Sequence, residues 1–577
     1  MGKTDNSPRI NPPSESNSAF HSNAMTLVSA DYLRMVYMKV QTLGKRSAAV
    51  LAALALAVGG NVVTAHAAAP TYIDCQLFGA GAPDFIDPAL TSTLVGANVA
   101  TMLFDGLTDT DANGNLYGEV ASKWVTKDGA KTWTFTLKKG LKFSNGEAVL
   151  PSSFVNGWKR SMDSKLASEV SYHGDFILGM NAYSTGMGAW PSSSVVADDK
   201  AMTLTVKMQD PTADWPSIVG HSVFSPIPTS MIGASGKVEE DGTKLVGNGP
   251  FMLDKAITKR AGGEVVIVPN PNYGGKAALL SKVTFKISSD VNAAYNAFAS
   301  GQCDNGPIPA GRYGELLGKW GTKGVKTTLG TDYWGFNWED PTVGGTKNKY
   351  LRSAISKAID REQISTVIYQ GVRKPASGLL PPGLPGYTAG QGLTNTRDLA
   401  GAKADYKRWL DLGNKTPEPI RLSYNDGAGW DKVASIIIAN LKDVGIPAKL
   451  DPFPADGTYF SKMRKGQGQM IRAGWFADYA IADNFLYPLL HSNSIGGDNL
   501  ERYSSASFDA LINSARSSTN KSFAQSQYRR AEVQALRNDV VITQTVNRGI
   551  ATVLASSTSV FPISPLGMIV FDQIVKN

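Results

Sequence analysis

The side chains that most often carry out chemistry are few and scattered in this sequence. The five histidines stand at positions 21, 66, 173, 221 and 491, too far apart to form a metal-binding or catalytic motif. The chain has no GxSxG, HExxH, GxxxxGK[ST] or strand-borne GxGxxG pattern. Catalysis by acidic pairs stays open, because Asp and Glu are too common to be interpreted in this way. The sequence favours binding over catalysis and predicts no catalytic residue, metal site or cofactor.

The two cysteines, Cys75 and Cys303, lie far apart and form no CxxC pair. This spacing excludes a Cys-rich zinc module. In an exported protein the two thiols could form one disulfide. As free thiols they would behave as small buried hydrophobic groups. The residues themselves leave both alternatives open.

Alternating strands and helices must position any site. Residues 133–137 and 203–207 alternate large apolar and small polar side chains, which predicts half-buried strands. A strand–helix–strand unit is predicted over residues 420–451, which implies a partly parallel sheet. Further strands are predicted at 71–78, 264–268 and 283–287, and helices at 154–162, 291–300, 349–370, 399–412 and 522–536. The pattern indicates a mixed α/β architecture, in which clefts between lobes are usual ligand sites.

Length and charge narrow the class of protein. A chain of 577 residues is too long for one core and predicts two or three lobes. The formal charge is +8, and residues 1–68 carry six Lys or Arg against three Asp or Glu. The remaining excess is spread along the chain, whereas nucleic-acid binding needs a concentrated basic face. We therefore expect no nucleic-acid partner.

The first 68 residues indicate export. Residues 1–37, rich in Ser, Asn and Pro, are interpreted as an upstream extension. Residues 38–68 have the layout of a secretory signal peptide: a basic start, an uncharged apolar run at 48–58 and small residues before the cleavage site. The apolar run is shorter than the about 20 residues that span a bilayer. We expect a soluble extracytoplasmic protein, periplasmic where an outer membrane exists and otherwise secreted or surface-retained.

Several passages, in order and spacing, resemble one family. They include Leu103-Phe-Asp-Gly-Leu-Thr108, Asp128-Gly-Ala-Lys-Thr-Trp-Thr-Phe135, Asn270-Pro-Asn-Tyr273, Ala358-Ile-Asp-Arg-Glu362 and Arg472-Ala-Gly-Trp-Phe-Ala-Asp-Tyr479. Together they are similar to the oligopeptide/dipeptide class (family 5) of ABC-transporter solute-binding proteins. The resemblance extends from about residue 71 to residue 577.

The resemblance implies an α/β, two-lobed, hinged periplasmic-binding-protein fold with an additional interposed domain. Lobe I would comprise residues 69–105, 245–330 and 540–577, the interposed domain II residues 106–244, and lobe II residues 331–539. The implied function is capture of short peptides in the interlobe cleft and delivery to the permease and ATPase subunits of an ABC importer. We expect a monomer that is not an enzyme.

A zwitterionic peptide in a closed cleft needs a counter-charge at each end, because burying an unpaired charge is costly. By resemblance, Asp478 pairs with the α-amino group of the peptide and Arg472 with the carboxylate of a short peptide. The residues alone would favour a loop-end or capping role for Asp478. For Arg472 they leave a structural salt bridge as an equal alternative. The other expected ligand contacts are Trp475, Gly474, Tyr479, Tyr459, Asn337 and Trp334, with Tyr333 and the backbone of loop 87–93 beside them. Packing or turn roles are the alternative for the aromatic residues and Asn337.

The chain departs from the family at two points. Many relatives have an acidic residue followed by Pro just after the Asp-Tyr pair, whereas this chain has Ala480-Ile-Ala-Asp-Asn484, so the rim of the first side-chain pocket is expected to differ. Phe476 stands where some oligopeptide binders have a cysteine, so that disulfide is absent. Cys75 and Cys303 instead fall on two strands expected in lobe I, where a cross-strand disulfide is feasible if the Cα atoms lie within about 7 Å. Alternative functions are binding of a non-peptide solute, such as a nickel chelate, haem, oligosaccharide or opine, and, more remotely, an exported hydrolase.

Overall fold

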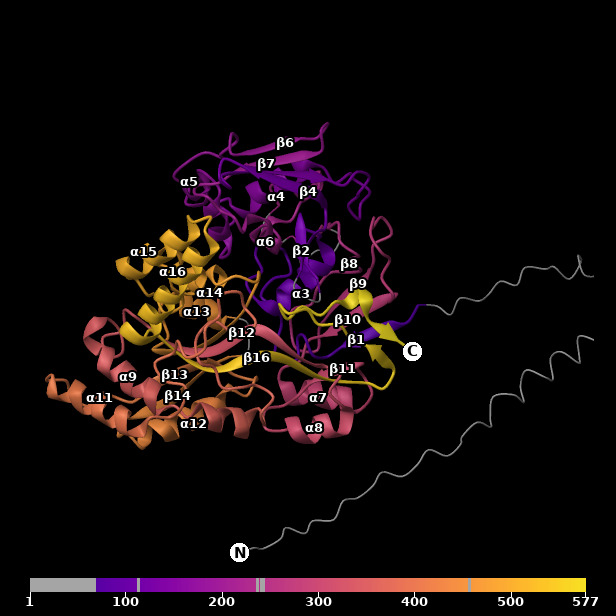
Figure 1. Ribbon diagram of the computed structural model, residues 1–577. Helices are drawn as coiled ribbons and strands as arrows, with labels where there is room; N and C mark the ends of the chain where they lie inside the picture. The colour runs from indigo at the N-terminus through magenta and orange to yellow at the C-terminus, as the bar shows by residue number, and fades with distance from the viewer. Residues whose placement is uncertain (1–68, 112–114, 235–237, 239–243, 455–457) are drawn as a thin grey trace, which may run out of the picture. The chain divides into compact units, whose positions relative to one another are not determined.

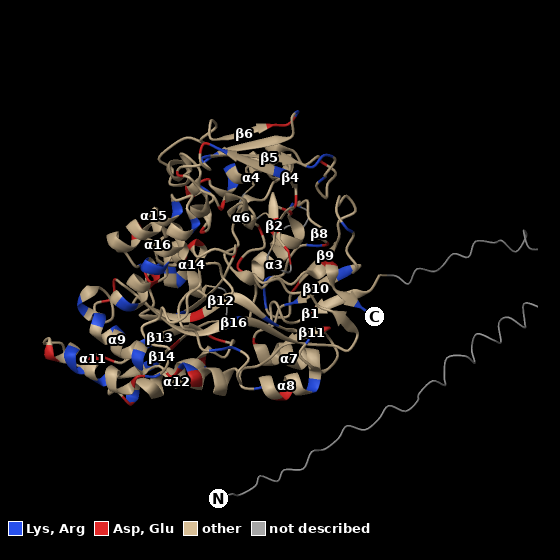
Figure 2. Ribbon diagram, in the orientation of Figure 1, with Lys and Arg blue, Asp and Glu red and all other residues tan. Residues whose placement is uncertain are grey.

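A computed structural model describes residues 69–111, 115–234, 238, 244–454 and 458–577. The predicted upstream extension and signal peptide lie outside the described residues. Within the described part, no helix combines the length and apolar character needed to cross a membrane. Basic and acidic residues are interspersed over the ribbon, and helices such as α11 (Leu399–Asp411) carry residues of both signs (Figure 2).

Ten strands form one mixed sheet through the middle of the ribbon (Figure 1). Their order is β14 (Ala448–Phe453), β13 (Ile420–Asn425), β15 (Met470–Phe476), β12 (Val325–Phe336), β16 (Ile542–Leu554), β11 (Asn305–Pro307), β1 (Thr71–Asp74), β10 (Lys282–Lys286), β9 (Glu264–Pro269) and β8 (Phe251–Leu253). β13 and β14 are parallel and are connected through helix α12 (Trp430–Lys442), as a parallel pair requires. This arrangement confirms the predicted strand–helix–strand unit.

The two longest strands, β12 and β16, join the two ends of this sheet. β12 pairs antiparallel with both β15 and β16, and β16 continues the sheet to β11. The last nine residues of β12 are all buried, which is typical of a central strand covered on both faces. Strands that are far apart in the chain are thereby brought into one sheet around β12.

Helices pack around the sheet in two buried clusters. The first cluster takes side chains from α7 (Val291–Ala299), α8 (Tyr313–Trp320), α9 (Lys349–Ala358), α11 and α12, which lie at the bottom of Figure 1. The second takes side chains from α13 (Tyr459–Arg464), α14 (Asp483–Leu490), α15 (Ala506–Arg516) and α16 (Lys521–Val533). Both clusters are apolar, so burial of these helix faces supplies the main stabilisation.

A separate four-stranded antiparallel sheet lies at the top of Figure 1. Its order is β4 (Ala121–Lys127), β5 (Thr132–Leu137), β7 (Thr203–Lys207) and β6 (Val195–Asp198), and it packs with α4 (Pro151–Ser161), α5 (Met180–Ser184) and α6 (Trp215–Ile218). Trp158 and Trp215 are fully buried in this core. The smaller elements are α3 (Leu94–Leu103), β2 (Thr108–Thr110) paired with β3 (Leu116–Gly118), and β17 (Thr558–Val560) paired with β18 (Val575–Lys576).

Two predicted elements are shorter in the structure. The strand predicted over 71–78 ends at Asp74, because the Asp74 carboxylate accepts a hydrogen bond from the Leu77 amide and turns the chain. The helix predicted over 349–370 breaks after Ala358, where Ile359 is extended and Asp360 caps the next turn. At the break, the buried Arg361 side chain donates to the Gln544 carbonyl of β16. The apolar periodicity continues across the break and therefore hides it.

Candidate functional site

A cavity of about 280 Å³ lies between segments that are distant in the sequence. It is lined by the loop and first turn of α3 (residues 91–95), by residues near 170 and 221, by strand β15 with the loop after it, and by Asp498 and Arg548. Four of the predicted ligand-binding residues lie in this lining: Arg472, Gly474, Trp475 and Asp478. Tyr333 and residues 91–93 of the predicted loop also line it.

The other four predicted contacts have packing or turn roles and are not among the residues that line this cavity. The Tyr459 hydroxyl donates to the carbonyls of Ser423 and Arg472, behind β15. The side-chain amide of Asn337 donates to the carbonyls of Gly466 and Gly468. Trp334 and Tyr479 are buried in hydrophobic clusters. For these residues the packing alternative describes the observed contacts.

Asp478 follows the end of β15 and is held by one neighbour. The Asn484 side-chain amide donates to Asp478 Oδ2 at 2.9 Å, and the Asp478 amide donates to Asn484 Oδ1 at 2.8 Å. Asn484 Oδ1 also accepts from the Trp475 indole at 3.0 Å. Burial raises the pKa of Asp478 to about 7, although the Asn484 hydrogen bond opposes the rise. With a quarter of its side chain exposed, the carboxylate is fixed in direction and open to the cavity.

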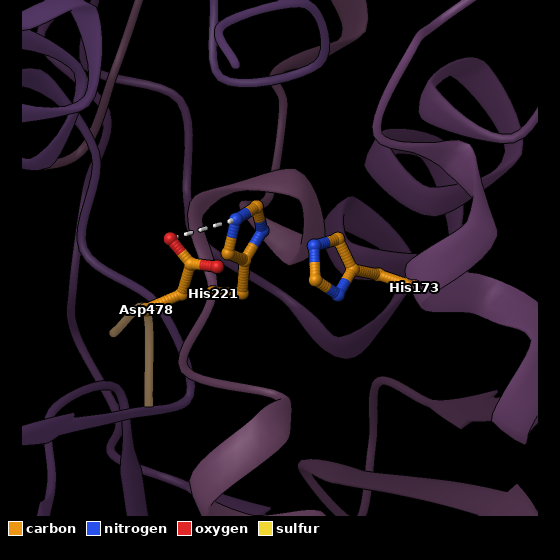
Figure 3. Close-up of side chains that lie close together, drawn as sticks. All are labelled: His173, His221 and Asp478. Atoms are coloured by element: carbon orange, nitrogen blue, oxygen red, sulfur yellow. Dashed lines mark ion pairs between the residues drawn. The ribbon is translucent and has the colours of Figure 1, made fainter. Parts of the chain in front are cut away.

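Two histidines, His173 and His221, lie beside Asp478 (Figure 3). His221 Nε2 is 4.0 Å from Asp478 Oδ1, and the two imidazoles stack at 4.1 Å between ring centroids. Burial lowers the pKa of His221 to about 4 and that of His173 well below its usual range, so both rings are neutral at pH 7. The histidines are scattered along the sequence, and nothing there predicts this proximity, because it arises only from tertiary packing.

One ligand atom from each of these three side chains lies within 4.8 Å of the others, close enough to consider a cation. Imidazole lone pairs lie in the ring plane, however, and the planes of the stacked rings differ by only 29°, so their lone pairs do not converge. His221 Nδ1 accepts the Val223 amide, which places the proton of the neutral ring on Nε2, facing Asp478. The group is therefore better suited to hold an ionic partner of Asp478 than to chelate a metal.

Arginines gather around Asp332 in another part of the site. Arg373 Nη1 lies 2.7 Å from Asp332 Oδ2, and Arg548 Nε lies 3.0 Å from Asp332 Oδ1. The Arg472 guanidinium stacks on Trp430 at 3.6 Å and donates to Asn425 Oδ1 at 3.2 Å. A Cβ on Gly474 would come within 2.4 Å of Asp332 Oδ1, so this glycine makes room for the cluster. Arg548, Arg373 and Asp332 were not predicted, because three distant segments supply them.

The structure joins Cys75 and Cys303 in a disulfide, with the Cα atoms 5.9 Å apart. The two residues flank the parallel pairing of β1 with β11, where Asp74 lies opposite Asn305. The residues alone left the disulfide open, and the resemblance placed the two cysteines on strands of lobe I, where a disulfide was feasible if those strands were neighbours. Neither cysteine is among the residues that line the cavity.

The family model described as bacterial extracellular solute-binding proteins, family 5 (middle), matches residues 115–497. The Bacillus subtilis oligopeptide-binding protein OppA is 28% identical over 463 residues, covering 78% of this chain and 83% of that protein. A probable deoxycholate-binding periplasmic protein of Escherichia coli, YgiS, is 27% identical over 459 residues, covering 78% of this chain and 84% of that protein. The solved structure of the E. coli murein tripeptide binding protein MppA superposes with a TM-score of 0.78 at 25% identity, covering 88% of this chain and 98% of that one.

Proposed function

This chain belongs to the bacterial extracellular solute-binding proteins of family 5, and on that premise we propose that it captures short peptides in the cavity beside Asp478. The peptide would then pass to the permease of an ABC importer, driven by its ATPase subunits. The protein would act as a monomer outside the cytoplasmic membrane, periplasmic where an outer membrane exists.

The observation that carries this proposal is the oriented carboxylate of Asp478. Within the described residues no Lys or Arg pairs with this carboxylate, the nearby His221 is neutral, and burial raises the pKa of Asp478. A peptide ammonium supplies the missing positive charge, and a buried carboxylate gains most from a partner that is both charged and hydrogen-bonded. Arg472, in the same lining, supplies a positive charge for the carboxylate end.

The relatives support two cargo classes, and Asp478 favours one of them. Oligopeptide and murein peptide are the ligands named for two relatives, and deoxycholate for a third. A bile acid is an anion without an ammonium group, so it would leave the Asp478 carboxylate buried and unpaired. Such burial is costly. Peptide cargo fits the observed charge at this position better.

The test is calorimetry with tri-alanine on the purified protein and on Asp478→Asn. This substitution keeps the shape and removes the charge, so we expect a loss of about a hundredfold in affinity. Asp443→Asn is the matched control, because Asp443 pairs with Arg397 on the outside of the fold. Unchanged affinity in Asp478→Asn would contradict the assignment.

Mass spectrometry of the purified protein, before and after incubation with tri-alanine, tests both the chemical class of the bound solute and the hydrolase alternative. A binding protein retains its ligand unchanged. We therefore expect cellular peptides to copurify with the protein and added tri-alanine to remain intact on incubation with it. Shortened peptides would favour an enzyme, and a copurified bile acid or other non-peptide solute would favour the second cargo class.

A further inference from the structure

The arginines of the cavity outnumber the acids available to them. Arg472 and Arg548 both line the cavity. Asp332 is the acid shared by this group, and it is already paired with Arg373 at 2.7 Å, the shorter of its two contacts. Among the described residues, no carboxylate oxygen lies within 4.0 Å of the Arg472 guanidinium. This region of the cavity therefore carries two positive charges beyond the one that Asp332 neutralises.

The two guanidinium groups are held in place yet keep donors free. Arg472 stacks on Trp430, and Arg548 stacks on Phe476 at 4.0 Å. Stacking fixes the plane of a guanidinium and leaves its edge open for a bidentate contact with a carboxylate. The Nε atoms of both arginines are buried without a hydrogen-bond partner, since the contact of Arg548 Nε with Asp332 lacks hydrogen-bond direction. Burial lowers the pKa of Arg548 to about 10, which still leaves it protonated at pH 7.

The remaining charges of the cavity lining are balanced or negative. Arg464 is paired with Asp498 and with Glu169. Asp478 is the negative group left for a ligand cation. The charges of the lining are therefore complementary to a ligand with one positive group and two negative groups. A simple zwitterionic peptide provides only one of each.

We propose that the protein selects short anionic peptides, in which an acidic side chain in the last two residues accompanies the free terminal carboxylate, with Arg472 and Arg548 each binding one carboxylate. This inference rests on the proposed peptide-binding function and specifies its substrate class. Arg548 becomes a specificity-determining residue. The cavity of about 280 Å³ lies just below the roughly 300–1,000 Å³ typical of sites for drug-sized ligands, which favours two or three residues.

The test compares two peptides of nearly equal shape, Ala-Ala-Glu and Ala-Ala-Gln, by calorimetry. We expect Ala-Ala-Glu to bind about ten- to a hundredfold more tightly, because it satisfies the second guanidinium with a charge-assisted hydrogen bond. Arg548→Met should reduce this preference to about threefold or less, whereas Arg548→Lys should keep part of it. Arg397→Met is the matched control, since Arg397 pairs with Asp443 away from the cavity lining.

Each outcome separates this inference from the proposed function. Binding of Ala-Ala-Gln to Arg548→Met shows that the variant is folded, so a lost preference reports on Arg548 alone. Equal affinity of the wild-type protein for the two peptides, with Asp478→Asn still weakening binding by about a hundredfold, would overturn the anionic selectivity and leave peptide binding standing. If neither peptide binds the wild-type protein, both the proposed function and this inference are overturned.

Discussion

Asp478 occupies a position where a carboxylate is difficult to keep ionised without a ligand. The Asn484 side chain orients it, and burial raises its pKa to about 7. Since the pKa in the folded protein is above the about 3.9 of an unfolded chain, the empty protein loses stability as the pH rises through this interval. A bound ammonium removes this penalty by pairing with the charged form.

This residue predicts a bell-shaped dependence of peptide affinity on pH. Below about pH 7, Asp478 must release a proton before it can pair, so affinity should rise by up to about tenfold per pH unit. Above about pH 8, the peptide α-amino group, with a pKa of about 7.7–8.0, loses its own charge and affinity should fall. Calorimetry with tri-alanine from pH 5 to 9 measures the profile. An N-acetylated peptide is the control, and a flat profile for the free peptide would contradict the pairing.

At the residue scale, the sequence predicted the part of the site that lies on one segment. Arg472, Gly474, Trp475 and Asp478 are close in the chain, and the family resemblance locates them together. His173, His221 and Arg548 come from other segments, and their types alone carry no signal. Tyr459 was predicted to contact the ligand, but its hydroxyl donates to two backbone carbonyls and it is not among the residues that line the cavity.

At the scale of elements, the local sequence pattern predicted whether a segment is a helix or a strand better than it predicted where that element ends. The strand–helix–strand unit of β13, α12 and β14 is visible because its periodicity changes from two to about 3.6 and back. The break after Ala358 is not visible, because it depends on the contact of Arg361 with β16, almost two hundred residues away. The end of β1 likewise depends on one side chain, Asp74, which turns the backbone.

The disulfide between Cys75 and Cys303 should stabilise the fold without contributing to ligand binding. It closes a loop with a sequence separation of 228, and it lies outside the cavity lining. Cross-linking distant residues restricts the unfolded chain, so the double variant Cys75→Ala/Cys303→Ala should lose about 2–4 kcal/mol of unfolding free energy. Denaturant unfolding measures this loss, with reduced wild-type protein as the control. A tenfold loss of peptide affinity at a temperature where the variant is folded would contradict a purely structural role.

At the scale of the whole described unit, the sheet explains why distant segments meet at one cavity. β12 and β16 join strands contributed before residue 325 to strands contributed after residue 420. The resemblance predicted this mixed α/β, two-lobed fold, whereas composition and periodicity alone stopped at α/β. Pairing across a discontinuous sheet leaves no local mark in the sequence, and that is why residues such as Arg548 had to be found in the structure.

Arg464 also connects segments that are distant in the sequence: with its own segment, its contacts involve four parts of the chain. It is paired with Glu169 and Asp498, and it donates to Ser92 Oγ at 3.1 Å and to the Gly497 carbonyl at 3.1 Å. Only 8% of its side chain is exposed. In a hinged binding protein, contacts that bridge the cavity wall stabilise the closed state, and ligand affinity depends on the population of that state.

Arg464→Gln should therefore weaken peptide binding although the proposed contacts of the peptide itself, Asp478, Arg472 and Arg548, are unchanged. The variant leaves Glu169 and Asp498 without their shared cation, so we expect about a tenfold loss of affinity together with a lower melting temperature. Calorimetry gives the affinity and thermal unfolding gives the stability. Arg312→Gln is the control, because it removes an exposed pair with Glu315 within one helical turn. A lower melting temperature with unchanged affinity would show that Arg464 stabilises the fold and does not bias closure around the ligand.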